Sequence, residues 1–413
     1  MKQHVPLTRE MQDHSRSLYA IGKVVLFGAG LFVRPAIHSL AQRGMVPLCI
    51  CDNSEAKQGT RIMEISVTSP TQAISAYPDA TVIITTLPVY FGEIKNQLNS
   101  IGFHSVIDAS FLLASFDYCN KTFSHGISSL HFQLDKYFYN YFLLHTPKLL
   151  ILPSIDIMIT EKCSLKCKDC SNLMQYYLNP KHLDFEYTMD SLDTLMDNVD
   201  HVLELRILGG ETFMNKEAYR YINRIRKYKN YSRIAVYSNG TIIPRGNNLE
   251  CLKYDDTYLR ISDYGESSKN VKVIIKLLDC ENINYNLEKV INWQDCASVE
   301  KRQRSIEKTM EVYKCCCANQ TLTLLNGKIY NCPFAANAAN LKMLPTFYEE
   351  TVKLKSNKII REHLLKMLRE EKNFRTCEYC AGRPDDDTPL PAAVQTAKPL
   401  SFEKIKIKHG WKS

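Results

Sequence analysis

A closely spaced set of three cysteines lies in the segment TEKCSLKCKDCSN. Cys163, Cys167 and Cys170 form a C-x3-C-x2-C array directly after the apolar run SIDIMIT. Three thiolates on one loop can hold three corners of a 4Fe-4S cluster, and the fourth iron then lacks a protein ligand. An open coordination position distinguishes a catalytic metal centre from a closed structural one. The alternatives are a zinc site or three buried thiols.

A second set of cysteines lies near the end of the chain. Cys317, Gly327 and Cys332 form a C-x9-G-x4-C pattern, and Cys377 and Cys380 follow as C-x2-C. Four thiolates from a hairpin-like segment and a distant C-x2-C are enough to close a cluster completely. A zinc ribbon is the alternative, because paired C-x2-C ligands are common to both kinds of site.

Some cysteines have less certain assignments. Cys315 and Cys316 directly precede Cys317, and only spacing favours Cys317 as the ligand. The cysteines outside both patterns are expected to be buried free thiols. They are Cys49, Cys51, Cys119, Cys251, Cys280 and Cys296.

Polar and glycine residues end the apolar runs that follow the first cysteine set. Gly209, Gly210 and Glu211 end LELRILGG. Residues without Cβ let a ligand approach the backbone, and a carboxylate can accept a hydrogen bond from a cationic amine. Ser238 and Asn239 end the next run, although Asn-Gly is also a strong turn signal. The run after that ends in four polar residues that are expected to face cofactor or substrate: Arg260, Ser262, Asp263 and Tyr264.

A glycine turn follows a predicted buried strand near the beginning of the chain. FGAGLFV contains Gly28 and Gly30, with Val33 where a dinucleotide fingerprint would have a third glycine. Asp52 ends the next strand, 22 residues after Gly30, at the distance expected of a ribose-binding acid. The pattern predicts a nucleotide or nucleotide-sugar site. A sheet that has lost any ligand is the alternative.

Apolar runs alternate with helix-like stretches in two series, which predicts an α/β fold. KVVLFGAG, VPLCICDN, ATVIITT and HSVIDAS predict a small parallel sheet. The later series, with functional residues at its strand ends, suits a full or partial barrel. The expected organisation is a flexible or loosely docked polar lead-in over 1–20, the sheet over 21–112, a helical connector over 113–150, the barrel over 151–312, the cysteine-rich region over 313–383, and a linker with a basic tail over 384–413.

Composition excludes several classes of protein. The 413 residues are 45% hydrophobic and 23% charged, which excludes a wholly disordered or collagenous chain. The net charge of +8 is dispersed, so no nucleic-acid partner is implied. No apolar stretch suits a membrane span or a secretory signal, so we expect a cytoplasmic protein without a membrane partner. In a reducing compartment its fifteen cysteines do not form a disulfide scaffold.

The cysteine triplet, GGE and SNG together resemble the radical S-adenosylmethionine (AdoMet) superfamily over about residues 151–383. The resemblance implies a partial (β/α)6 barrel with a catalytic 4Fe-4S cluster and AdoMet. Gly209, Gly210 and Glu211 would grip the amino group of AdoMet, while Ser238 and Asn239 would bind its ribose or carboxylate. The superfamily often has an aromatic residue before the third cysteine, near the adenine, whereas this chain has Asp169.

The resemblance also implies the chemistry. One electron, from a flavodoxin- or ferredoxin-type donor, cleaves AdoMet to a 5′-deoxyadenosyl radical that abstracts hydrogen from a substrate. The second cysteine set resembles the auxiliary-cluster extension called SPASM or, in its shorter form, twitch. No cysteine follows Cys380, so the twitch form with one auxiliary 4Fe-4S cluster is expected. That cluster could accept an electron, bind substrate or be structural.

The amino-terminal sheet is similar to small Rossmann-like domains of sugar-modifying enzymes, including the nucleotide-sugar-binding part of bacterial sugar acetyltransferases. A carbohydrate-like or nucleotide-linked small molecule is therefore the expected substrate, for oxidation, epimerisation or rearrangement. A peptide-modifying maturase is the rival within the superfamily. A zinc-stabilised nucleotide-sensing protein is the rival from another class. The sequence does not predict the oligomeric state.

Overall fold

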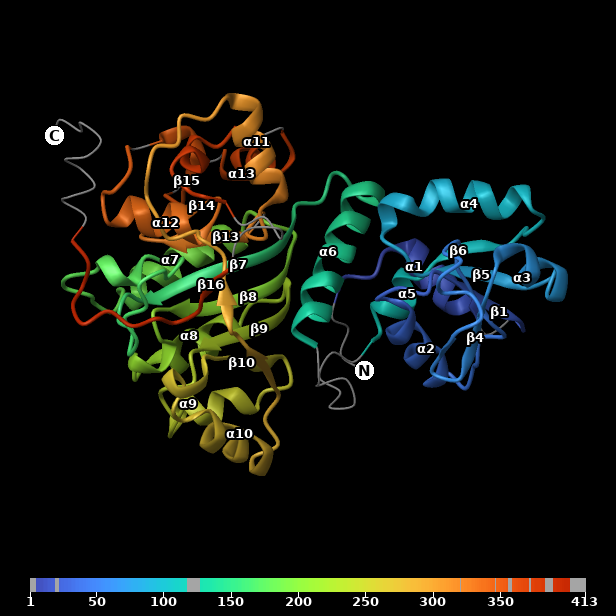
Figure 1. The fold of residues 1–413 in the computed structure, drawn as a ribbon, viewed down its shortest axis with the longest axis horizontal. Coiled ribbons are helices and arrows are strands. Elements are labelled where there is room, and N and C mark those ends of the chain that lie inside the picture. Colours follow the sequence, from blue (N-terminus) through green and yellow to red (C-terminus); the bar gives the residue numbers. More distant parts are fainter. Residues whose placement is uncertain are drawn as a thin grey trace. The chain divides into compact units, whose positions relative to one another are not determined.

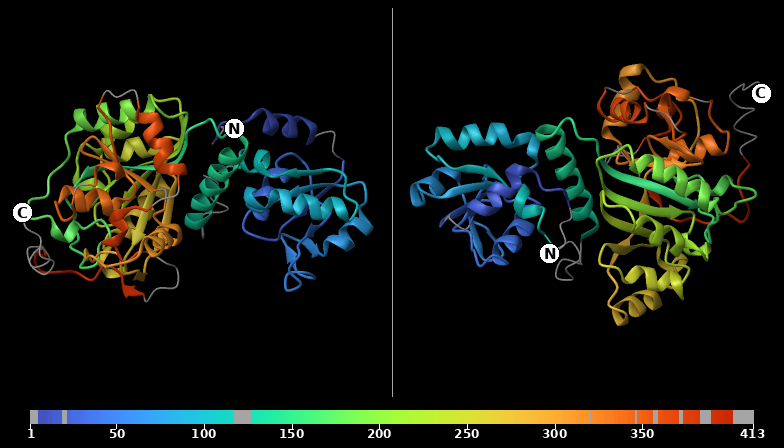
Figure 2. Two further views of the ribbon diagram at one scale, coloured as in Figure 1. Left: turned by 90° about the horizontal axis from the view of Figure 1, so that it is seen from above. Right: turned by 180° about the vertical axis from the view of Figure 1, so that it is seen from behind.

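The structure is a computed structural model that describes residues 5–18, 22–116, 127–319, 321–345, 347–355, 359–370, 373–382 and 389–401 (Figure 1). The chain divides into two compact units, Met1–Ile151 and Leu152–Ser413. Two further views show the ribbon of each unit (Figure 2). No described helix has the length and apolar character needed to cross a membrane.

The first unit contains a six-stranded sheet in the order β3-β4-β2-β1-β5-β6. All neighbours are parallel except β3 and β4. Its strands are β1 (Val24–Phe27), β2 (Ile50–Cys51), β3 (Arg61–Ile62), β4 (Ile65–Thr68), β5 (Thr81–Ile84) and β6 (Val106–Asp108). Its helices are α1 (Arg9–Ser17), α2 (Val33–Ala41), α3 (Pro70–Ala76), α4 (Phe91–Ser100), α5 (Ser110–Leu113) and α6 (Ile127–His145). Both β1 and β5 are fully buried, as in a parallel sheet covered on two faces. The predicted parallel α/β sheet is confirmed.

The beginning of the chain differs from the expected loose lead-in. Thr8 caps α1 by accepting from the backbone N–H of Met11, and the Met11 side chain is completely buried. Leu18 is also completely buried, and α1 packs against α5. Met11 is the only apolar residue of α1, so one buried side chain within the helix, with Leu18 at its end, was enough to dock it. Residues 1–4 and 19–21 lie outside the described part of the chain.

The predicted helical connector over 113–150 contains α6 and only the last residue of α5, with residues 117–126 outside the described part. α6 packs against α5 and against the short helix η2 (Pro88–Tyr90), both in the first unit. Its aromatic side chains supply much of that contact, and the ring of Tyr137 lies 5.1 Å from that of Phe32. The aromatic run therefore belongs to the core of the first unit.

The second unit contains an eight-stranded sheet in the order β11-β10-β9-β8-β7-β13-β14-β15. Its strands are β7 (Ile151–Thr160), β8 (His201–Gly209), β9 (Tyr231–Ser238), β10 (Thr257–Asp263), β11 (Tyr285–Lys289), β13 (Thr321–Leu325), β14 (Lys328–Tyr330) and β15 (Thr351–Lys353). Four helices follow the first four of these strands, namely α7 (Phe185–Met196), α8 (Ala218–Ile225), α9 (Asn247–Glu250) and α10 (Val271–Cys280).

The mixed α/β fold expected for this unit is confirmed, with one difference in strand order. β13 comes from the cysteine-rich region, yet it pairs in parallel with β7, the first strand of the series. A chain-order (β/α)6 series would add its sixth strand beside β11 instead. β14 and β15 then continue the sheet in antiparallel fashion. The remaining elements are α11 (Ile306–Cys315), α12 (Pro333–Asn340), α13 (Ile360–Arg369), β12 (Asn292–Trp293) and β16 (Leu390–Pro391).

Candidate metal centre

The cysteine triplet occupies the loop that leaves the buried strand β7. Cys167 is buried, whereas Cys163 and Cys170 are half-buried. Burial raises the pKa of Cys163 well above its usual range. Burial also raises the pKa of Cys167 to about 11, although a hydrogen bond from Gln395 lowers it. Thiols in such surroundings become thiolates only when a bound cation or cluster offsets the charge. The loop thus lacks the low thiol pKa of a reactive cysteine, and its role as a ligand set stays a prediction.

The glycines at the end of β8 let this strand dock directly on the cysteine loop. The backbone N–H of Gly210 donates to the Thr160 carbonyl at 3.1 Å. A Cβ on Gly210 would lie 2.6 Å from the Cβ of Cys163 and even closer to the Lys162 carbonyl oxygen. A Cβ on Gly209 would collide with the Thr160 carbonyl oxygen. The two glycines therefore bring β8 against the loop, in addition to any access that they give a ligand.

Glu211 is a buried carboxylate beside this contact. Its oxygens accept from the backbone N–H groups of Asn239 at 2.7 Å and Phe213 at 3.1 Å, and from the Ser238 hydroxyl. Burial nevertheless raises the pKa of Glu211 to about 7, because these hydrogen bonds offset only part of the desolvation. No described Lys or Arg forms an ion pair with it. A bound cationic group would complete its surroundings.

Ser238 and Asn239 connect the end of β9 to the same place. The Ser238 hydroxyl binds Glu211, and the Asn239 amide donates to the Cys163 sulfur at 3.6 Å and to the Ser164 hydroxyl at 3.2 Å. The structure thus brings together the predicted strand-end residues and the cysteine loop. These side chains bind one another in the structure, and a direct contact of Ser238 and Asn239 with ribose or carboxylate stays a prediction.

The end of β10 supplies an aromatic side to the site. Burial raises the pKa of Tyr264, and negative charge on the cysteine triplet would raise it further. The indole of Trp293 packs against Tyr264 edge-on, with ring centroids 5.4 Å apart. Trp293 was not singled out in the sequence. It lies in β12, beyond the strand-end motifs, where no local pattern marks it.

The other predicted residues of β10 divide between two roles. Arg260 donates to Glu288 at 2.7 Å and to the Tyr237 hydroxyl at 3.3 Å, on the face of the sheet that holds further polar side chains. Asp263 accepts from the backbone N–H of Gly265 at 2.9 Å, and the Ser262 carbonyl accepts from Ser268. Arg260 therefore remains a candidate for binding a ligand, whereas Asp263 and Ser262 stabilise the turn.

The segment expected to be a linker instead docks on the cysteine loop where the structure describes it. β16 pairs with β12, and Gln395 lies in a bridge with Cys167. The Gln395 amide donates to the Cys167 sulfur at 3.2 Å, and its oxygen accepts from the Lys166 N–H at 2.7 Å. Sequence reasoning missed this contact because its partners are 228 residues apart. The basic tail over 402–413 lies outside the described residues.

The second cysteine set is brought together by three elements. Cys332 caps α12, and its sulfur accepts from the N–H of Ala335 at 3.4 Å. Cys377 has its pKa raised by burial and by the thiolates of Cys332, Cys380 and Cys316. Cys316 is half-buried, whereas Cys317 and Cys315 are exposed. Burial and electrostatics favour Cys316 beside the other three, and the ligand assignment itself stays a prediction, with Cys315 and Cys317 as the alternatives.

The half-buried Arg304 and the buried Glu350 hold the C-x2-C loop in place. Arg304 donates to the carbonyls of Cys377 and Cys380 at 2.6 Å each. The carboxylate of Glu350 accepts from the N–H of Thr376 at 3.2 Å and from its hydroxyl at 2.6 Å. Neither residue lies in a sequence motif. Both act on backbone groups that only the fold brings near.

The spacing of the thiols bears on the choice between zinc and a cluster. Among the described residues, no three cysteines have sulfur atoms that all lie within 4.8 Å of one another. Tetrahedral zinc, with Zn–S bonds of about 2.3 Å, holds its sulfur ligands about 3.8 Å apart. An iron–sulfur cubane separates its thiolates more widely because each binds a different iron. The choice between zinc and clusters at the two cysteine sets stays a prediction from the sequence.

In the predicted nucleotide site of the first unit, the Asp52 carboxylate is bonded to neighbouring groups of the protein. Asp52 accepts from the backbone N–H groups of Ala29 at 2.7 Å and Ser54 at 2.8 Å, and from the Lys57 ammonium at 3.2 Å. Burial raises the pKa of Asp52, but these donors outweigh burial and lower it overall. The carboxylate thus stabilises the turn through Gly28 and Gly30. A ribose contact stays a prediction and would have to replace the lysine.

Comparisons with known proteins agree with the iron–sulfur interpretation. The family described as a 4Fe-4S single cluster domain matches residues 157–259, which include the cysteine triplet, Glu211 and Asn239. No curated protein matches the chain. The match confirms the predicted 4Fe-4S character of this part of the chain.

Several solved structures are similar at low identity. They include anSMEcpe with bound AdoMet and Cp18Cys peptide (12% identity, 62% of this chain and 95% of that chain, TM-score 0.36). BtrN in complex with AdoMet and 2-DOIA is also similar (13%, 60% and 97%, TM-score 0.36), as is Streptococcus suis SuiB (14%, 55% and 47%, TM-score 0.29). At such values the likeness establishes no activity. Residues 157–259 are, by their family match, similar to a 4Fe-4S single cluster domain, set here in a mixed α/β unit.

Proposed function

We propose that this protein is a radical AdoMet enzyme with one auxiliary cluster. The proposal rests on the contacts between the cysteine loop and the ends of β8 and β9. These contacts involve Cys163, Gly210, Glu211 and Asn239. A closed structural metal site would not need a buried, uncompensated carboxylate beside its ligands. When bound, the cluster and AdoMet supply a one-electron cleavage that yields a 5′-deoxyadenosyl radical.

The residues of this chain have distinct roles in the proposed site. Glu211 and the backbone of Gly210 would bind the amino group of AdoMet, and Asn239 orients Cys163. Tyr264 and Trp293 offer an aromatic surface near the cysteines, which suits an adenine and compensates for Asp169 at the superfamily's aromatic position. The apolar cluster around Met158 and Leu208 packs against Cys163 and Cys170 and excludes water from the radical.

We further propose a polar, carbohydrate-like or nucleotide-linked substrate. Arg206 is in register with Ala235 of β9, and Tyr237 lies two residues further along that strand, so both side chains are on the same face of the sheet. Arg260 of β10 is in register with Tyr237 and shares this face. Arg206 lies 3.6 Å from Asp156 and is buried, while the side chain of Arg260 is 21% exposed and can reach an anionic group. An apolar substrate would have to desolvate these groups without replacing their hydrogen bonds.

The test is anoxic reconstitution of the full chain followed by reduction with AdoMet. We expect about eight irons per chain, from two 4Fe-4S clusters, and formation of 5′-deoxyadenosine. Deuterated nucleotide sugars should transfer deuterium into the deoxyadenosine. Transfer from peptides alone would replace the substrate proposal with a maturase. Two bound zinc ions and no deoxyadenosine would refute the enzyme. A reducing cytoplasm with a flavodoxin- or ferredoxin-type donor is the proposed setting.

AdoMet affinity is expected to depend on pH through Glu211. Its pKa in the free protein is about 7, so below this pH the carboxyl group is protonated and loses its attraction for the ammonium group. Affinity should therefore fall as pH decreases from about 8 to 6 and level off above. The Glu211→Gln variant should bind AdoMet at least about tenfold more weakly, with little pH dependence over this range. Equilibrium binding at several pH values measures both, and equal profiles would contradict the assigned contact.

Gln395 is expected to raise the reduction potential of the catalytic cluster. A donor to the Cys167 sulfur stabilises the more negative, reduced state. Gln395→Ala should make the midpoint potential more negative by on the order of tens of millivolts. A shift of this size corresponds to part of the free energy of one hydrogen bond to a charged group. Redox titration followed by EPR measures it. Thr396→Ala, which removes a neighbouring side-chain contact to Lys166, is the control and should leave the potential unchanged.

The auxiliary ligand set is expected to include Cys316. Cys316→Ala should reduce the iron content toward a single cluster, because a closed site loses one of four thiolates. Cys317→Ala, an adjacent exposed cysteine, should retain nearly all the iron. Iron and sulfide analysis of the two variants decides the assignment. If Cys317→Ala lost iron and Cys316→Ala did not, Cys317 would be the ligand, as the spacing predicts.

A further inference from the structure

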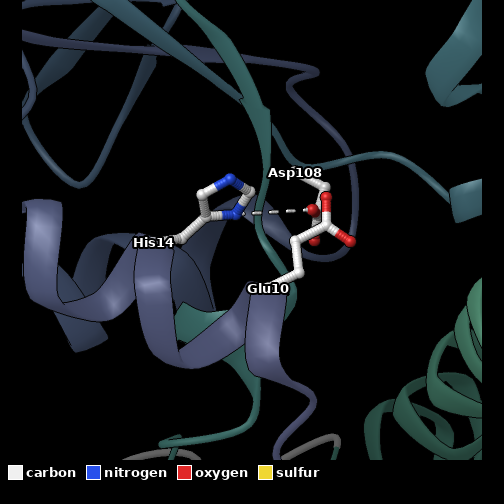
Figure 3. Close-up of side chains that lie close together, drawn as sticks. All are labelled: Glu10, His14 and Asp108. Carbon is white, nitrogen blue, oxygen red and sulfur yellow. Dashed lines mark ion pairs between the residues drawn. The ribbon is translucent and has the colours of Figure 1, made fainter.

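We propose that Glu10, His14 and Asp108 form a binding site for a divalent first-row cation in the first unit. Glu10 and His14 are four residues apart on α1, so they share one face of the helix. Asp108 is the last residue of β6, and all three side chains point toward one another (Figure 3). None of these residues belongs to the iron–sulfur site, and the inference does not rest on the proposed enzyme function.

The distances suit a metal better than a hydrogen bond. One ligand atom from each residue lies within 4.8 Å of the other two. The Nδ1 of His14 is 3.8 Å from the nearest Asp108 oxygen, which is too long for a hydrogen bond. That nitrogen is buried and has no hydrogen-bond partner among the described residues. An ion with bonds of about 2.1 Å joins ligand atoms up to about 4.2 Å apart, so a small rotation of Glu10 completes the site.

The charges around the site also favour a cation. Two carboxylates meet here, and no described Lys or Arg forms an ion pair with Glu10 or Asp108. On α6, Tyr141 and His145 face Glu10, the Tyr141 hydroxyl donates to its carboxylate at 3.5 Å, and neither residue adds a permanent positive charge. A bound dication would neutralise Glu10 and Asp108 together, while His14 would bind it through the neutral imidazole.

Neighbouring groups hold the carboxylates in position. The backbone N–H of Ser110 donates to the other Asp108 oxygen at 2.7 Å, which leaves one oxygen facing His14. The Nδ1 of His145 lies 3.3 Å from Glu10, and His145 stacks on Tyr141 at 4.3 Å. Partners of this kind orient the ligands of protein metal sites.

The ligand set predicts which ions bind. One imidazole and two carboxylates suit Mn²⁺, Fe²⁺ or Zn²⁺, whereas Ca²⁺ prefers oxygen ligands alone. Asp108 is buried, and the side chain of Glu10 is 47% exposed, so an ion can enter from the Glu10 side. Three protein ligands leave positions for water or for an oxygen of an anionic small molecule.

The test uses Mn²⁺, which binds oxygen and nitrogen ligands in preference to thiolates. The full chain, with its clusters reconstituted and excess iron removed, is titrated with Mn²⁺ while EPR measures the free ion. We expect saturation at one Mn²⁺ per chain. Glu10→Gln and His14→Gln should weaken this binding by at least about tenfold. His104→Ala, an exposed histidine in the same unit, should leave it unchanged.

Folding is checked separately by thermal melting of each metal-free protein. Glu10→Gln is the decisive variant, because its isosteric side chain is half exposed and should not disturb the α1 contact. Weaker binding with an unchanged metal-free melting temperature supports the site. A wild-type chain that binds no Mn²⁺, or a Glu10→Gln variant that binds it as the wild type does, would show that the three residues form only an ion-pair cluster and would overturn the proposal.

Discussion

Replacing Cys163, Cys167 and Cys170 together by alanine is expected to abolish the reductive cleavage of AdoMet. The loop that carries them holds no other cysteine, so it offers no other thiolate to replace them. About half of the iron should be lost, because the auxiliary site is expected to keep its own four-iron cluster. The measurements are the yield of 5′-deoxyadenosine after reduction and the iron content of the anoxically reconstituted protein.

A matched control separates loss of ligands from general damage. Cys280→Ala removes a thiol at the end of α10, which is exposed and not buried as the sequence led us to expect, and should change neither quantity. Replacing Cys377 and Cys380 should leave the catalytic cluster able to form if the chain folds. Deoxyadenosine formation that persists in the triple variant would show that the ligands had been assigned wrongly.

Gly210→Ala is expected to have a similarly large effect without removing any ligand. Its Cβ would lie 2.6 Å from the Cβ of Cys163 and closer still to a backbone oxygen, neither of which can rotate away. Overpacking of this kind costs about 1–3 kcal/mol or more. The cysteine loop must move away from β8, so AdoMet affinity should fall by at least about tenfold and cluster content should decrease.

Gly30→Ala provides the comparison for this substitution. Nothing lies within 4 Å of a Cβ built on Gly30, and its backbone does not have a positive φ. This variant should reconstitute and bind AdoMet as the wild type does. If Gly210→Ala behaved in the same way, the close contact between β8 and the cysteine loop would not control the site.

The local parts of the fold and site could be predicted from the sequence. The runs around β1 and β5 are continuous apolar segments that end in glycine or polar residues, and each forms a strand at that place. The short hairpin of β3 and β4 was not predicted, because RIMEISVT alternates too briefly to form a pattern. The cysteine triplet was recognised because its three residues lie in one short loop, so their spacing in the sequence keeps them close together in the fold.

Contacts between distant segments could not be predicted. Gln395 lies in a stretch rich in proline and polar residues that has the composition of a linker, yet it binds Cys167. Arg304 donates to backbone carbonyls, and a sequence pattern does not predict which carbonyl a side chain will contact. Cys316 is half-buried and Cys317 is exposed, although both directly follow α11. Such a difference in burial depends on tertiary packing and not on residue type.

The addition of β13 to β7 has a consequence for any shortened form of the chain. β7 lies between β8 and β13 in the sheet. The backbone groups on the edge of β7 that faces away from β8 pair with β13, which follows more than 150 residues later in the chain. Truncation before residue 313 would leave a long apolar strand with unpaired N–H and C=O groups at a sheet border. Such borders associate with other chains, so the shortened protein would self-associate before its chemistry could be assayed.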